Sequence, residues 1–180
     1  MYRTRELARW SANPTRLAAR LVRDGALVAL GHGLYACPTP SFFGPKLPDD
    51  AAVMRAFLGS DEFVFSGPPT WTPLGLGATA AWSSTLVYNR KRTGEFHFAG
   101  RTYLLRRVDF PADPSPEWRV IDLLRHHEQA GVDVETVAQR LRTSVENGRF
   151  DVAALLVCAS TFAEVSIRTV LEQALGVWIG

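Results

Sequence analysis

The chain of 180 residues has little of several residue types that functional sites commonly need. Its two cysteines, Cys37 and Cys158, each stand alone in an apolar stretch, so neither a disulfide framework nor a paired-cysteine metal site is indicated. Its only lysines are Lys46 and Lys91. Neither has an acidic residue two places before it, so the sequence lacks the acid-x-Lys pattern with which a common metal-dependent nuclease motif ends.

Long hydrophobic runs are also missing. No run approaches the roughly 18 apolar residues that cross a bilayer, and the N-terminus "MYRTRELARW" lacks the apolar stretch of a signal peptide. We therefore expect a cytoplasmic protein with no membrane partner.

Motifs of catalysis are absent as well. The sequence has no phosphate-loop, GxSxG or HExxH pattern, and "GLGATA" lacks the lysine that ends a phosphate loop. His126 and His127 are neighbours on an expected helix, where they point about 100° apart and cannot bind one metal ion from one face. We expect no enzyme activity, no cofactor and no metal; a nuclease-like enzyme with an unrecognised site is the weaker alternative.

Positive charge is concentrated in two segments, although the net charge of the chain is only +2. Residues 1–40 hold six arginines against Glu6 and Asp24, and residues 90–107 hold six basic side chains against Glu95. Residues 108–180 are acidic, with eleven acids against six arginines. Two basic regions therefore stand out on a neutral to acidic body.

The residue pattern predicts an α+β fold in two domains, residues 1–40 and 48–180, separated by a proline-rich stretch that begins at Pro38. The second is expected to be a mixed α/β domain with a small, mainly antiparallel sheet followed by C-terminal helices. Its expected elements are a helix over 49–59, strands in "EFVFSG", "STLVYN", "EFHFAG" and "RTYLLRRV", an irregular apolar loop over 68–82, and helices over 116–131, 133–148, 150–162 and 163–176. The last two strands are expected to form a hairpin that turns at Ala99 and Gly100.

The first 40 residues predict a winged helix-turn-helix. Asn13 caps a helix that begins at Pro14 and ends near Asp24, after a short helix in "TRELARW" and the turn "SAN". The segments "ALVAL" and "GLYACP" then form a hairpin that turns at Gly31, His32 and Gly33.

One side of the second helix is built from arginine. At 100° per residue, Arg16, Arg20 and Arg23 lie within an arc of about 60°, opposite Leu17, Ala18, Leu21 and Val22. An arginine face suits the major groove, where guanidinium groups bind guanine or phosphate, and a hairpin can contact the neighbouring backbone. The expected DNA-binding residues are Asn13, Thr15, Arg16, Ala19, Arg20, Arg23 and His32. Many solvent-facing helices also carry arginines, so no single member of this set is specific.

A second basic patch is expected from Arg90, Lys91, Arg92, Arg106 and Arg107, if their strands are neighbours. It would bind phosphate or keep a strand edge from pairing, and the sequence does not choose between these roles. The aromatic residues Trp71, Trp82, Tyr88 and Phe96 could stack on bases, although aromatic residues in strands and loops are more often part of a core.

The segment "LAARLVRDGALVALGHGLYACP" resembles the N-terminal winged helix of the AbiEi antitoxin family, in which a Gly-x-Tyr motif followed by proline ends the wing; those positions are Gly33, Tyr35 and Pro38. The resemblance continues through "FVFSGPPTWTPLGLGATAAWSSTLVYNRKRTGEFHFAGRTYLLRRVDFP". Family members usually have one more helix before the helix-turn-helix. Either the start of this chain is truncated, or C-terminal helices cover the exposed core.

The resemblance implies the antitoxin of a type IV toxin–antitoxin system that represses its own operon. The implied partners are double-stranded promoter DNA and a nucleotidyltransferase toxin that it counters without a stable complex, with the chain acting as a monomer or weak dimer on DNA. The alternative is an RNA- or protein-binding module in which the winged helix is only a scaffold.

Overall fold

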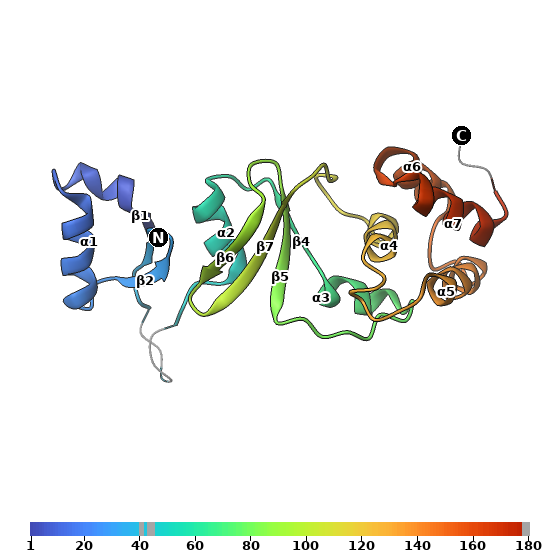
Figure 1. The fold of residues 1–180 in the computed structure, drawn as a ribbon, viewed down its shortest axis with the longest axis horizontal. Helices are drawn as coiled ribbons and strands as arrows, with labels where there is room; N and C mark the ends of the chain where they lie inside the picture. Colours follow the sequence, from blue (N-terminus) through green and yellow to red (C-terminus); the bar gives the residue numbers. More distant parts are fainter. Residues whose placement is uncertain (40–41, 43–45, 178–180) are drawn as a thin grey trace.

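The computed structural model describes residues 1–39, 42 and 46–177. The fold is α+β, with an N-terminal module at one end, a four-stranded sheet in the middle and the helices α4 to α7 at the other end (Figure 1). The strands are β1 (Tyr2–Arg3), β2 (Val28–Gly31), β3 (Leu34–Ala36), β4 (Phe63–Ser66), β5 (Ser84–Asn89), β6 (Gly94–Phe98) and β7 (Arg101–Arg107). The helices are η1 (Thr4–Arg9), α1 (Pro14–Arg23), α2 (Asp50–Leu58), α3 (Pro68–Trp71), η2 (Thr72–Leu74), α4 (Pro116–Arg125), α5 (Val134–Glu146), α6 (Val152–Phe162) and α7 (Val165–Leu175). Within the described ranges, no helix is both long and apolar enough to cross a membrane.

The N-terminal module has the expected element order of helix, helix and hairpin. The side chain of Asn13 accepts a hydrogen bond from the Arg16 amide at 3.0 Å, and Pro14 is the first residue of α1. The first helix differs in kind, because η1 is a 3-10 helix. The sequence did not indicate β1, which pairs with β3 to complete a three-stranded antiparallel sheet in the order β1-β3-β2.

The second sheet is mixed. Its order is β4-β5-β7-β6, and β5 pairs with β7 in parallel while the other two pairs are antiparallel. The expected hairpin between β6 and β7 is confirmed, with Ala99 and Gly100 both at positive φ. The helix expected over 49–59 is also confirmed, since Asp49 caps α2 and Gly59 ends it.

Two expectations for this part of the chain were wrong. The segment over 68–82 is not wholly irregular, because it contains α3 and η2. Prolines are tolerated in the first turn of a helix, so Pro68 and Pro69 begin a helical turn where the sequence indicated a loop. The helix expected over 116–131 ends at Arg125. Turns follow it, and the ring of His126 stacks on Trp71 at that point.

The tip of the β2–β3 hairpin packs against the central sheet. Leu30, Leu34 and Ala36 belong to one hydrophobic cluster with side chains of α2, β5, β6 and β7. The amide of Ala99 donates a hydrogen bond to the Leu30 carbonyl at 2.8 Å. The cover of the N-terminal module therefore comes from α2 and the sheet. Of the two alternatives that the sequence left open, cover by C-terminal helices is wrong, since those helices lie at the far end (Figure 1).

This cluster draws residues from both sides of the expected domain boundary. Part of the boundary stretch, residues 40–41 and 43–45, lies outside the described residues, as do the last three residues, 178–180. The division into domains 1–40 and 48–180 remains a prediction.

Gly31 makes the docking of the hairpin possible. Its φ is +121°, and a Cβ atom placed there would lie 2.5 Å from the carbonyl oxygen of His97. We expect Gly31→Ala to lower the free energy of unfolding by about 1–3 kcal/mol more than Gly25→Ala, because the new methyl group has no room. Urea unfolding measures both variants.

Gly25 is the matched control, because it also has a positive φ of +74°, but a Cβ atom added there would meet no other atom within 4 Å. Equal losses in the two variants would show that backbone conformation alone, and not the contact with His97, sets the cost.

Candidate nucleic-acid interface

The arginines of α1 form an exposed face, defined here as the α1 arginine face (Arg16, Arg20 and Arg23). All three side chains are exposed, and that of Arg23 retains 77% of its accessible surface. On the opposite side Ala18 is completely buried, whereas Leu17, Leu21 and Val22 are half-buried. The helix is thus held to the module by one side and presents guanidinium groups from the other.

A groove runs along this face and ends at an exposed aromatic ring. Among its lining residues are Trp10, Asn13 and Ala19, together with the three arginines of the face. Trp10 is 62% exposed and makes an edge-to-face contact with Tyr2. Leu7, three residues before Trp10, is buried instead. Thr15 is exposed on the first turn of α1.

His32 lies apart from the α1 arginine face. Its ring centroid is 5.4 Å from that of Phe96 and 5.3 Å from that of Phe98, and its Nε2 accepts a 3.4 Å hydrogen bond from the His97 amide. The turn of the hairpin is therefore directed at β6. His32 lines a different hollow, together with Arg3, Arg5 and Arg92.

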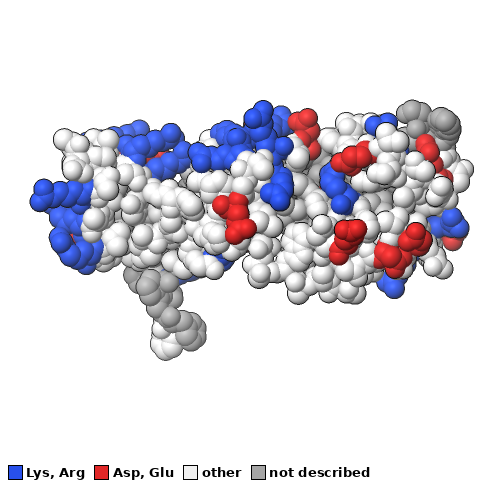
Figure 2. All heavy atoms as spheres, viewed as in Figure 1, with Lys and Arg blue, Asp and Glu red and all other residues white. Residues whose placement is uncertain are grey.

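The second basic patch is brought together at one end of the central sheet. Because β5 and β7 are parallel neighbours, Arg106 and Arg107 lie beside the end of β5, from which Arg90, Lys91 and Arg92 follow. Asn89, which is completely buried, organises this end: its side chain donates to the Arg92 and Arg106 carbonyls and accepts from the Lys91 and Arg92 amides. Basic side chains gather over the N-terminal module and this part of the sheet, whereas the helices at the far end also carry many acids (Figure 2).

Part of the second basic patch serves the fold. Lys91 Nζ donates to the carbonyls of Leu58 and Gly59 at 3.0 and 3.3 Å, and the guanidinium of Arg92 lies 4.6 Å from the ring centroid of Phe57. Arg3 approaches the same place and donates to the carbonyls of Ala56 and Phe57. Positive charge is favourable near a helix C-terminus, so these side chains stabilise the end of α2.

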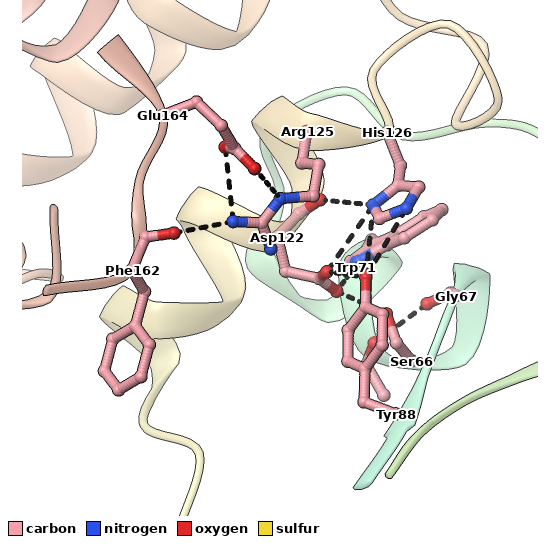
Figure 3. Close-up of polar contacts among 10 residues, drawn as sticks. Ser66, Gly67, Trp71, Tyr88, Asp122, Arg125, His126, Phe162 and Glu164 are labelled. Atoms are coloured by element: carbon pink, nitrogen blue, oxygen red, sulfur yellow. Dashed lines mark hydrogen bonds and ion pairs between the residues drawn. The ribbon is translucent and has the colours of Figure 1, made fainter. Parts of the chain in front are cut away.

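A buried carboxylate connects the central sheet to the C-terminal helices (Figure 3). Asp122 of α4 is completely buried, and its carboxylate accepts hydrogen bonds from the Ser66 hydroxyl, from Trp71 Nε1 at 2.8 Å and from the Tyr88 hydroxyl at 2.5 Å. His126 Nδ1 lies 3.5 Å from the same carboxylate and 2.9 Å from the Asp122 carbonyl. A carbonyl only accepts, so Nδ1 carries the proton. These five residues form the Asp122 network.

The electrostatics of the network follow from its burial. Burial alone would raise the pKa of Asp122, but the hydrogen bonds from His126, Ser66 and Tyr88 outweigh it and hold that pKa below its ordinary value. Burial, with the adjacent Asp122 carboxylate, raises the pKa of Tyr88. The carboxylate is thus ionised and the phenol neutral in the folded protein at neutral pH.

The Asp122 network has the residue types of a nucleophilic triad but a different order of contacts. In a triad the histidine stands between the serine and the acid. Here the Ser66 hydroxyl donates directly to Asp122, and Ser66 is itself buried, so His126 is not positioned as its base. The contacts suit a structural joint between β4, β5, α3 and α4.

No sequence pattern identified Asp122 and its partners as a group. The members are separated by as many as 60 positions, from Ser66 to His126, and no spacing relates them. The one available signal was Asp122 itself, an acid within the apolar face of "VIDLL". The interpretation of Trp71 and Tyr88 as core residues is confirmed.

We expect Asp122→Asn to lower the free energy of unfolding by about 3–5 kcal/mol, because donors arranged around a carboxylate lose their charged acceptor. The pH dependence should change too. The folded-state pKa of Asp122 lies below its unfolded value, so its stabilisation is complete above about pH 4 and is lost as the pH falls through the folded-state pKa. Urea unfolding of the native chain and the variant at a series of pH values measures this contribution of Asp122 to the free energy of unfolding.

The exposed Asp109 supplies the control, and Asp109→Asn should keep both the stability and the acid dependence of the native chain. If Asp122→Asn lost stability in acid in parallel with the native chain, Asp122 would not be the source of that dependence.

Potential metal ligands are dispersed. In the part of the chain that the structure describes, no three His, Cys, Asp or Glu side chains lie close enough to hold one metal ion. Comparison of the chain with known protein families, with curated proteins and with solved structures finds no match.

Proposed function

We propose that this chain binds double-stranded DNA in a sequence-specific manner by inserting α1 into the major groove. The observation that carries this proposal is the α1 arginine face, on which three exposed guanidinium groups line one groove with Asn13 and Ala19. Arginine binds guanine or phosphate through paired hydrogen bonds, which suits it to this surface.

The order of the N-terminal elements supports a winged helix-turn-helix. The helices η1 and α1 are followed by the β2–β3 hairpin, and β1 adds a third strand beside β3. The hairpin turn packs on β6, so we assign the DNA contact to α1 and leave His32 out of it. Arg90, Arg106 and Arg107 are exposed. Arg90 and one of the other two, which point to opposite faces of β7, would supply a second phosphate contact.

The biological role that we propose is autoregulation by the antitoxin of a type IV toxin–antitoxin system. The resemblance to the AbiEi family supports this role, and the exposed arginine face is compatible with it. The partners would be the promoter of its own operon and a nucleotidyltransferase toxin, with no stable complex between the two proteins.

A single-stranded nucleic acid is the second candidate ligand, and one observation favours it. Trp10 is 62% exposed at the end of a groove lined by arginines, and proteins that bind single strands use exposed aromatic rings as stacking platforms. Competition of single-stranded RNA or DNA with the duplex distinguishes the two candidates.

We expect Arg20→Ala to weaken binding to the DNA upstream of the gene by about 5- to 150-fold, corresponding to roughly 1–3 kcal/mol for a lost base contact. If Arg20 contacts phosphate instead, the slope of log affinity against log salt falls by about 1 and all sequences are affected alike. Gel shifts at several salt concentrations, on the upstream DNA and on scrambled DNA, measure both quantities.

Arg140→Ala on α5 is the control, because Arg140 is also an exposed helical arginine but lies in the C-terminal helices. Arg107→Ala tests the second basic patch in the same assay and should give a smaller, sequence-independent loss. Weak binding to every DNA that Arg20→Ala leaves unchanged would rule out α1 as the recognition helix.

The antitoxin role makes a separate prediction. Co-expression of the chain with the nucleotidyltransferase encoded beside it should restore growth that the nucleotidyltransferase alone arrests. Arg20→Ala should lose repression of a promoter reporter but keep this rescue, since no stable contact between the proteins is proposed. Failure of the native chain to rescue growth, with the protein present at normal level, would refute the antitoxin role and leave DNA binding untouched.

A further inference from the structure

A hollow of about 440 Å³ lies between α3, η2, the start of α4 and the segment before α6. Its walls are apolar and come from Pro69, Pro73 and Pro116 together with Leu74 and Phe150. Its charged lining residues are Arg119 and Arg149, and among the described residues no aspartate or glutamate lines it. The hollow therefore combines an apolar interior with positive charge that none of its own lining residues neutralises.

Arg119 has a donor without an acceptor. Its Nη1 atom is buried and has no hydrogen-bond partner among the described residues. A buried donor on a charged group is costly when it is left unpaired, so Arg119, a lining residue of the hollow, still has a hydrogen-bond donor to satisfy.

Arg149 is fixed in position beside the hollow. Its Nη2 donates to the Pro73 carbonyl at 2.6 Å, and its guanidinium lies against the backbone of Gly75. A Cβ atom at residue 75 would be only 2.7 Å from Arg149 Nη1, so glycine is needed for this close approach. The guanidinium group of Arg149 is thus placed before any ligand arrives, which lowers the entropic cost of binding.

We propose that this hollow binds a small organic anion, with a carboxylate or phosphate between Arg119 and Arg149 and an apolar body against the prolines and Phe150. Guanidinium groups bind carboxylate and phosphate oxygens through charge-assisted paired hydrogen bonds, and apolar walls with few polar groups are typical of small-molecule sites. The site is independent of the proposed DNA contact, since α3 and α4 lie far along the molecule from α1 (Figure 1).

Isothermal titration calorimetry of the full chain tests this site with phenyl phosphate, benzoate and inorganic phosphate. We expect phenyl phosphate or benzoate to bind, and more tightly than inorganic phosphate, because only the former two have an apolar body. The stronger of the two identifies phosphate or carboxylate as the preferred group. Arg119→Gln and Arg149→Gln should each lower the affinity at least about tenfold. Arg140→Gln, an exposed arginine outside the hollow, should leave the affinity unchanged.

Nuclear magnetic resonance of the native chain locates the ligand independently of the variants, which guards against a variant that fails to fold. The amide signals of Thr70, Arg119 and Phe150 should shift on addition of the tighter probe, while those of α1 stay in place. The site would be refuted by the absence of binding for all three probes at millimolar concentration. Equal affinity in all the folded variants, or shifts confined to other residues, would refute it as well.

Discussion

The buried carboxylate of Asp122 is the constraint on which the assembly of the C-terminal half depends. An ionised group without water must be surrounded by donors, and the chain supplies them from Ser66 of β4, Trp71 of α3 and Tyr88 of β5, with His126 just after α4. Each of the first three donors fixes the distance between its own element and α4. Apolar contacts tolerate sliding, whereas three hydrogen bonds to one carboxylate do not, so this network sets the register of α4 against the sheet.

A second joint, also made of hydrogen bonds from side chains, lies on the other face of the sheet. The last carbonyls of α2 accept hydrogen bonds from Arg3 and from Lys91, two cations that are far apart in the sequence. Together with the hairpin tip on β6, this joint attaches the N-terminal module to the sheet. The α1 arginine face is not part of this joint. The basic residues that stabilise the fold are therefore distinct from those available to bind a polyanion.

Local chemistry determined what the sequence could predict. Helix α1 has Asn13 as a cap and proline at its first position, and α2 has Asp49 and Gly59 at its ends, so their bounds followed from neighbouring residues. The hairpin turns at Gly31–Gly33 and at Ala99–Gly100 were likewise local. The parallel pairing of β5 with β7 could not be predicted from neighbouring residues, because it depends on the order in which the strands lie side by side in the sheet.

In the candidate site, too, local features could be predicted and contacts between distant segments could not. The periodicity of α1 identified its arginine face correctly, since helical geometry alone decides which side chains share a side. It could not show that Trp10 is exposed, which depends on how η1 packs on α1. Nor could it show that His32 packs on phenylalanine rings, which depends on how the module meets the sheet. The end of α4 at Arg125 could not be predicted either, because it depends on the contacts of His126 with Trp71 and Asp122.

The docking of the hairpin tip has a consequence for how the chain is made. Residues 1–39 leave the ribosome before the surfaces that complete them, which are Phe57 of α2 and His97 to Ala99 at the end of β6. Until then Leu30 and Leu34 have no partner from the sheet, and the nascent segment has an open apolar edge. The arginine helix can form early, but its orientation relative to the rest of the molecule is decided only after the β6–β7 hairpin has emerged.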